Sequence, residues 1–143
     1  MRLTLPMILG AAVLTGAGYL LFAPAGGPDP SMPKAARGGS VVPVTVPELT
    51  GNAVIGQRVF AAKCAQCHGD NGAGTDGSGP PLIHPTYRAG HHGDQSFVLA
   101  ARNGVKSHHW PFGDMQPVEG ISESEVLMVV EFIRAVQQAN GIN

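Results

Sequence analysis

The sequence predicts an all-α domain of about three helices and long loops, preceded by an apolar N-terminal helix and a Pro/Gly-rich linker. Apolar residues recur at helical spacing in three stretches, and the segments between them have no alternating strand pattern. The chain has 143 residues, which suits one domain with appendages. Charged residues make up 13%, which excludes a coiled coil, and the net charge of −1 gives no basic surface for nucleic acid.

Residues 1–23 have the features of a membrane or export segment. Positions 3–23 contain no charged residue and follow Arg2, and as a helix they would be about 31 Å long, the thickness of a bilayer core. Two interpretations stay open: an uncleaved signal-anchor, or a signal peptide cleaved near Ala23-Pro24-Ala25. Under either interpretation the rest of the chain is exported. We expect a single-pass protein of the bacterial cytoplasmic (inner) membrane facing the periplasm, or a soluble periplasmic protein after cleavage.

The remainder of the chain divides into a linker and a head. Residues 24–47 hold six of the twelve prolines and four glycines, which is typical of an extended linker. Residues 48–143 contain the periodic apolar segments and form the predicted domain.

Two helices are expected in the first part of the head. The first covers residues 53–65, with Thr50 or Asn52 as its N-cap. The residues expected on its apolar face are Ile55, Val59 and Phe60. A second helix covers about 95–102, with Asp94 as its N-cap.

The third predicted helix has the clearest pattern. Ser122 and Glu125 have the spacing of a capping box, and Gly141 ends the helix. Its apolar stripe consists of Val126, Val129, Val130, Ile133 and Val136. Because residues 69–93 form a long loop without strand pattern, three helices alone would build a poor core. We therefore expect the head to be built around a cofactor.

Cys64-Ala65-Gln66-Cys67-His68 is a C-x-x-C-H motif, the attachment signature of c-type haem. Two thiols three residues apart near a helix end can add to the two vinyl groups of one haem, and the next residue brings an imidazole to the iron. A thioredoxin-like redox pair would need a strand–turn–helix context. A zinc site would need further ligands, and the chain has no second C-x-x-C.

From about 51 to 142 the chain resembles the class I cytochromes c, which are small monohaem electron carriers. Gly56 and Phe60 match the glycine and aromatic residue of that family's first helix. Val129 and Phe132 match the apolar and aromatic pair of its last helix. The resemblance implies that these two helices cross closely, and that one haem c is bound through two thioethers.

The resemblance also implies roles for the residues after the motif. The segment 79–82 (Gly-Pro-Pro-Leu) matches the family's G-P-x-L segment. Its Pro80 carbonyl would accept a hydrogen bond from Nδ1 of His68, and Leu82 would pack on the proximal haem face. Arg88 lies where family members often keep a basic partner for a haem propionate.

Met115 is the sixth iron ligand that the resemblance implies, opposite His68. It precedes the last helix, although Gln116 intervenes before Pro117, where the family often has proline directly. Trp110 and Phe112 are expected to line the haem pocket on the methionine side. The low dielectric of such a pocket helps to set the reduction potential.

Five further histidines have no role in this scheme. They form the pairs His91-His92 and His108-His109, with His84 nearby. Three interpretations stay open: solvated loop residues, a binding or docking site for a further metal such as copper, or a histidine that ligates the iron.

The sequence thus predicts a single-electron carrier rather than an enzyme. Its partners would be a quinol-oxidising complex and a terminal oxidase or reductase, and its N-terminal helix would contact the membrane. The alternatives are a haem subunit of a redox enzyme or a periplasmic copper-handling redox protein. The head carries six Lys/Arg against nine Asp/Glu, and of its residues Lys63 and Lys106 alone are lysines. Docking is therefore expected not to depend on a ring of lysines.

Overall fold

The computed structural model describes residues 38–143, so the predicted membrane or export segment lies outside the described residues. The elements are α1 (Asn52–Lys63), α2 (Ala65–His68), two 3₁₀ turns η1 (Asp70–Gly72) and η2 (Pro85–Tyr87), α3 (Asp94–Asn103) and α4 (Glu123–Ala139). Residues 38–143 contain four α-helices and no strand, which confirms the all-α prediction; the helix not predicted is the four-residue α2. No helix in this range is long and apolar enough to cross a bilayer.

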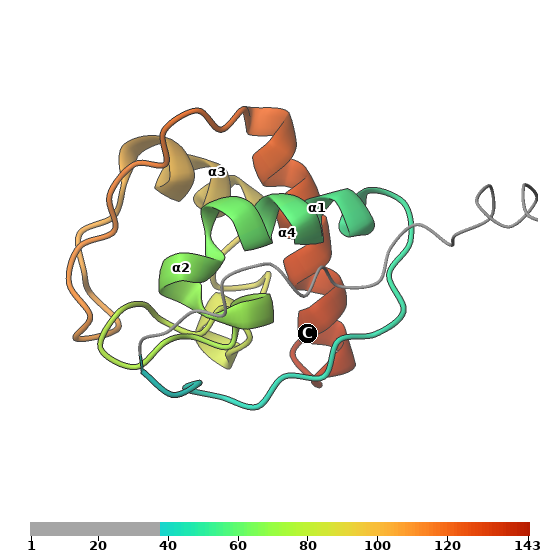
Figure 1. Ribbon diagram of the computed structural model, residues 1–143, viewed down its shortest axis with the longest axis horizontal. Coiled ribbons are helices and arrows are strands. Elements are labelled where there is room, and N and C mark those ends of the chain that lie inside the picture. Colours follow the sequence, from blue (N-terminus) through green and yellow to red (C-terminus); the bar gives the residue numbers. More distant parts are fainter. Residues whose placement is uncertain (1–37) are drawn as a thin grey trace, which may run out of the picture. The chain divides into compact units, whose positions relative to one another are not determined.

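Helices α1 and α4 cross at Gly56, and this crossing forms the centre of the domain (Figure 1). A Cβ atom at Gly56 would lie 1.9 Å from the carbonyl oxygen of Met128, so the two backbones are in direct contact there. Phe60 and Phe132 are fully buried beside the crossing, with ring centroids 5.6 Å apart. The close approach expected for this helix pair is therefore present, and it requires a residue without a side chain.

The start of α1 differs from the prediction. Neither Thr50 nor Asn52 caps it: the N-cap is Gly51, and no side chain bonds to the first turn. The Asn52 amide instead donates a hydrogen bond to the Glu131 carboxylate of α4 at 3.0 Å. Ile55 is 46% exposed rather than part of the core. The buried residues of α1 are Ala53, Gly56 and Phe60.

Helix α4 follows its sequence pattern closely. The Ser122 hydroxyl accepts from the Glu125 backbone N–H, and the Glu125 carboxylate accepts from the Ser122 N–H, so the capping box is confirmed. All five residues of the predicted apolar stripe are buried. The helix ends at Ala139, and Gly141 follows with a φ of +75°. A local pattern with a strong cap and a continuous stripe is enough to define such a helix.

Helix α3 packs on the N-terminal half of α4. It begins at Asp94 with Gly93 as its N-cap, so the prediction that Asp94 caps it is wrong. The Asp94 carboxylate instead accepts a hydrogen bond from Nε of Arg134 at 2.9 Å. A small second core forms between these helices from Val98, Ala101, Val126 and Val130.

The end of the predicted linker packs against the head. The Val42 N–H donates to the Ala73 carbonyl at 3.0 Å. Thr45 exchanges two hydrogen bonds with the Asn140 side chain, at 3.0 and 2.7 Å. Val44 and Val46 of this segment pack on the main core, as does Leu49 directly after it. Residues 42–47 therefore contribute to the folded domain.

Candidate functional site

The C-x-x-C-H motif lies at the junction of α1 and α2. Helix α1 ends at Lys63, and Cys64, with φ −121° and ψ −34°, interrupts the helical path before α2 carries Cys67 and His68. Cys64 is half-buried and Cys67 is exposed, and both carry free thiols. This short second helix puts both cysteines and the histidine on the wall of one cavity.

The protonation of Cys64 argues against a thiol–disulfide redox site. Burial raises the pKa of the Cys64 thiol to about 11, with a smaller contribution from neighbouring Cys67. A redox or nucleophilic cysteine needs a lowered pKa, because the thiolate is the reactive form. Cys64 therefore remains a thiol at neutral pH, which is unfavourable for thiol–disulfide exchange.

His68 is oriented by the segment that follows the motif. Its Nδ1 lies 2.9 Å from the Pro80 carbonyl oxygen, so the hydrogen bond expected from the resemblance is present. Burial lowers the pKa of His68, partly offset by this hydrogen bond, so the ring is neutral. With the proton held on Nδ1, the lone pair lies on Nε2 and is available to a metal ion. A Cβ atom at Gly79 would lie 2.5 Å from the Cys67 carbonyl oxygen, so glycine allows this segment to approach α2.

The cavity next to the motif has a volume of about 700 Å³, within the range of small-molecule and cofactor sites. It lies between α2, α3 and the segment that joins α3 to α4. Its walls include most of the residues that the sequence singled out: Cys64, Cys67, His68, Pro80, Leu82, Trp110, Phe112 and Met115. Cys64 and Met115, which are 51 positions apart in the sequence, thus line the same cavity.

Met115 lies at the fixed base of a loop. Its backbone N–H and carbonyl both bond to Val105, each at 2.9 Å, directly after α3. Within the loop, the Asp114 carboxylate accepts from the Ser107 N–H at 2.9 Å. The rings of Trp110 and Phe112 stack with centroids 5.9 Å apart. The backbone pairing therefore fixes the position from which the Met115 side chain lines the cavity.

The indole nitrogen of Trp110 tests whether the cavity fits a haem. Its Nε1 is buried and has no acceptor in good hydrogen-bond geometry; the nearest candidate is the Tyr87 phenol, whose pKa is raised by burial and lowered less by its contact with this indole. Leaving a buried donor unpaired costs about 1–3 kcal/mol. A group that brings an oxygen acceptor into the cavity, such as a haem carboxylate, would satisfy this N–H. The donor set and this unpaired nitrogen both fit haem.

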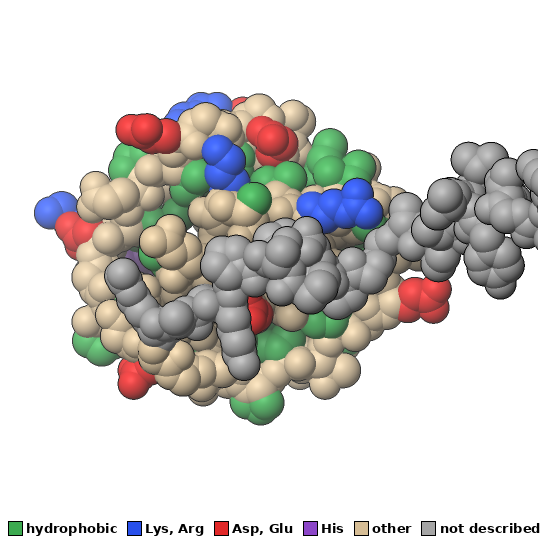
Figure 2. Space-filling view, viewed as in Figure 1, with side chains coloured by type: hydrophobic (Ala, Val, Ile, Leu, Met, Phe, Trp, Pro, Cys, Tyr) green, Lys and Arg blue, Asp and Glu red, His purple; other side chains and the backbone are tan. Residues whose placement is uncertain are grey.

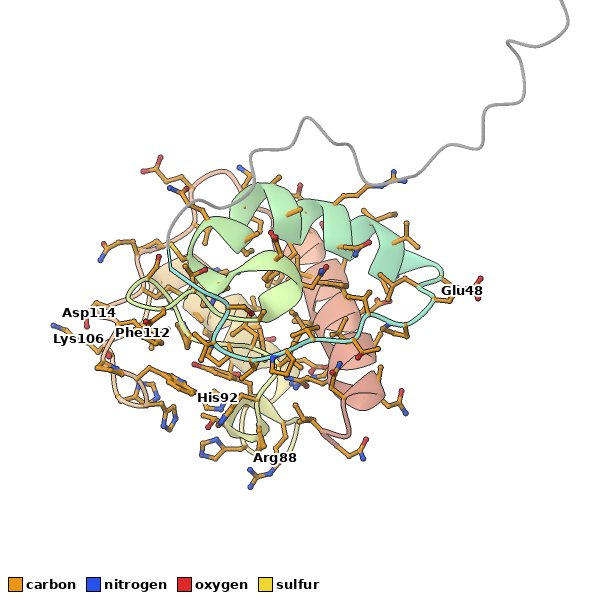
Figure 3. The ribbon with its side chains drawn as sticks, turned by 60° about the horizontal axis from the view of Figure 1, so that its bottom comes forward. Glu48, Arg88, His92, Lys106, Phe112 and Asp114 are labelled. Atoms are coloured by element: carbon orange, nitrogen blue, oxygen red, sulfur yellow. The ribbon has the colours of Figure 1, made fainter. Side chains whose placement is uncertain are left out.

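Arg88, which the resemblance implied as a basic partner of a haem propionate, is not part of the cavity lining. Its side chain is exposed, and Nη1 donates to the Pro85 carbonyl at 3.0 Å within its own turn. Figure 3 shows Arg88 at the outer edge of the domain, and it is not among the cavity residues.

Sequence reasoning missed the role of Arg134 in α4. Its guanidinium donates to Asp94, to the carbonyls of Tyr87 and His92, and to the side chain of Gln137. It also lies over the Phe97 ring, 5.1 Å from the centroid. One arginine thus joins α3, α4 and the loop that borders the cavity. The sequence did offer a signal for this role, because Arg134 is the one Lys or Arg of α4 and stands beside buried apolar residues.

Comparison with known proteins agrees with this geometry. A family model described as Cytochrome c matches residues 53–137, which run from α1 through the motif and Met115 into α4. No curated protein and no solved structure gave a significant match.

Proposed function

Because the chain belongs to the cytochrome c family, we propose that it is a single-electron carrier with one haem c held between His68 and Met115. Members of this family bind haem covalently and typically transfer electrons rather than turn over a substrate. The observation that carries the proposal is that Cys64, Cys67, His68 and Met115 line the same cavity.

The two cysteines would attach the haem. Each thiol would add across one vinyl group, with a new carbon–sulfur bond and the thiol hydrogen on the neighbouring vinyl carbon, so the attachment would need no oxidant. The protonated state of Cys64 at neutral pH is compatible with this addition. When bound, the haem supplies an iron that cycles between Fe(III) and Fe(II).

The remaining residues would tune the site. Pro80 holds the proton on Nδ1 of His68, which orients Nε2 and strengthens it as a ligand. The Trp110 N–H would donate to a haem carboxylate. The apolar surfaces of Trp110 and Phe112 exclude water, and a thioether ligand raises the reduction potential relative to a second nitrogen.

Met115 is favoured over the histidines as the sixth ligand by the way its loop is held. The backbone pairing with Val105 anchors Met115, whereas His108 and His109 lie in the middle of the loop. Their rings lie beside those of His91 and His92, with His91 and His109 centroids 5.4 Å apart. With both His68 and Met115 bound, the iron would have no open position for a substrate, as an electron carrier requires.

We further propose that the head works outside the cytoplasmic membrane, between a quinol-oxidising complex and a terminal oxidase or reductase. The apolar run at 3–23 supports export and anchoring. The head has three more acidic than basic residues, and on the face seen in Figure 2 the Lys and Arg side chains are separated from one another. Partners are therefore expected to dock without a large basic patch.

A pair of matched methionine variants tests the ligation. The ferric full-length protein should show the weak long-wavelength charge-transfer band of a Met–Fe(III) bond. Met115→Leu keeps the volume but removes the thioether, so the band should disappear and the potential should fall. The control is Met128→Leu, in α4 and outside the cavity, which should keep both the charge-transfer band and the reduction potential of the wild type.

Two outcomes would contradict this ligation. A band that survives Met115→Leu would exclude Met115 as the ligand. A wild-type protein with a high-spin, five-coordinate spectrum would favour a haem subunit of a redox enzyme, because an open iron position can bind a substrate.

A further inference from the structure

Three histidines outside the proposed haem ligation lie close together at the rim of the cavity. Each of the three residues His91, His92 and His109 offers one ring nitrogen, and these three nitrogens all lie within 4.8 Å of one another. The ring centroids are 4.6 Å apart for His91 and His92, and 5.2 Å apart for His92 and His109. His91 and His109 are exposed and His92 is half-buried, so the group is open to solvent. Figure 3 shows His92 near the loop that carries Lys106, Phe112 and Asp114.

The backbone orients two of these rings as metal ligands are usually oriented. The Thr86 carbonyl oxygen lies 2.8 Å from Nδ1 of His91 and 2.7 Å from Nδ1 of His92. A carbonyl only accepts hydrogen bonds, so a ring that donates to Thr86 carries its proton on Nδ1 and keeps the lone pair of Nε2. The two Nδ1 atoms also lie 3.0 Å from each other, so a proton on one of them can be shared with the other ring. An Nδ1–H bond to a backbone carbonyl is the outer contact that metal-bound histidines typically make.

The composition of the cluster indicates which ions it would take. It consists of three imidazoles, with no thiolate or carboxylate among its members. Imidazole suits copper and zinc, while calcium and magnesium require oxygen ligands. For a given set of nitrogen ligands, Cu²⁺ binds more tightly than the other divalent first-row ions. We propose that His91, His92 and His109 form a site for one divalent transition-metal ion, which binds Cu²⁺ most tightly and Zn²⁺ less tightly.

Metal binding would join two segments that border the cavity. His91 and His92 follow η2, whereas His109 lies in the loop between α3 and α4 that also holds Trp110 and Met115. That loop is anchored at its base by the pairing of Val105 with Met115. A metal ion on His109 would add a second anchor near the tip. The site thus links metal binding to the rigidity of the loop that provides the proposed sixth ligand, a consequence that rests on the proposed function.

His108 provides a matched control within the same loop. It is exposed, adjacent to His109, and outside the cluster. Its Nδ1 lies 2.8 Å from the Lys106 carbonyl, and its ring centroid lies 6.5 Å from that of His92. A binding site made by the three-histidine cluster should therefore tolerate its loss.

The test is a titration of the full-length, haem-loaded protein, stripped of loosely bound metal, with Cu²⁺ and separately with Zn²⁺. Calorimetry should give one equivalent of tightly bound Cu²⁺ in the wild type and in His108→Ala. His91→Ala and His109→Ala should each weaken Cu²⁺ binding at least about tenfold. His109→Gln serves as a second variant, and an unchanged haem spectrum checks that each variant is folded.

A second readout measures the link between the two segments. Saturating Zn²⁺ should raise the midpoint temperature of thermal unfolding for the wild type and for His108→Ala. The midpoint of His109→Ala should not change. Binding of several Cu²⁺ ions without saturation at one equivalent would overturn the proposal. So would unchanged Cu²⁺ affinity in His109→Ala, or an equal loss in His108→Ala. Because the stoichiometry does not depend on Met115, failure of the metal site and failure of the ligation proposal can be told apart.

Discussion

Replacing Gly56 by alanine tests the helix crossing at the centre of the domain. In an isolated helix this change is favourable, since alanine is a better helix former than glycine by about 1 kcal/mol. At the crossing the new methyl group would lie 1.9 Å from the Met128 carbonyl oxygen and 2.9 Å from the Val129 nitrogen. These are backbone atoms of α4, so no side-chain rotation can relieve the overlap.

The size of the effect follows from the separation that the overlap requires. Real Cβ atoms essentially never approach other atoms closer than 3.0 Å, so α1 and α4 must move apart by about 1 Å. A gap of this size removes roughly a quarter to a half of the dispersion energy of each contact across it. Phe60 and Phe132 are buried at this interface. After the gain in helix propensity, we expect a net destabilisation of about 3 kcal/mol.

Urea unfolding of the full-length haem protein, followed by helical circular dichroism, measures this effect. For a domain of this size, the expected loss corresponds to a thermal midpoint about 12–24 °C lower. Gly90→Ala is the control: nothing lies within 4 Å of its added Cβ, and its stability should stay within about 0.5 kcal/mol of the wild type. A Gly56→Ala protein as stable as the wild type, or more stable, would refute the close crossing.

Three further changes follow from the same structure. Arg134→Lys should lower the free energy of unfolding by about 2–3 kcal/mol in urea titrations, because lysine cannot reproduce the branched contacts of the half-buried guanidinium. Arg102→Lys, in an exposed ion pair, should change this free energy by less than about 0.5 kcal/mol. Cys67→Ser should reduce the yield of folded protein in a host that attaches haem, because without haem the short helices and long loops cannot offset the entropy lost on ordering them. A compact, fully helical head without haem would contradict this prediction. Lys63→Gln and Lys106→Gln should change electron transfer to a partner less than about threefold in stopped-flow measurements, and a steep dependence of the wild-type rate on salt would count against the absence of a lysine docking ring.

Local patterns in the sequence predicted the parts of the structure that depend on neighbouring residues. The capping box at Ser122 and the stripe from Val126 to Val136 need only their own helix and one apolar partner. The C-x-x-C-H motif likewise brings its three reactive side chains together over five residues. The pairing of Gly56 with α4 came from resemblance to a family, because nothing local shows which helix a glycine will meet.

Tertiary contacts decided the features that the sequence did not predict. Asn52 and Asp94 are good capping residues, but each bonds to α4 instead, through Glu131 and Arg134. Arg88 has the expected position in the chain and still lies outside the cavity, since it bonds within its own turn. Each case is a competition between a local and a distant partner, and a single sequence does not reveal the distant one.

The cavity explains why so few aromatic residues suffice for this domain. Aromatic residues make up 6% of the chain, and Phe60 and Phe132 serve the α1–α4 crossing. The cavity between α2, α3 and the Met115 loop is lined by Trp110, whose indole N–H is buried and unpaired. A bound haem would fill this space, satisfy that donor and hold the loop through Met115. The group that carries the electron would therefore also complete the packing around the cavity, which is why the head is expected to depend on haem for its folding.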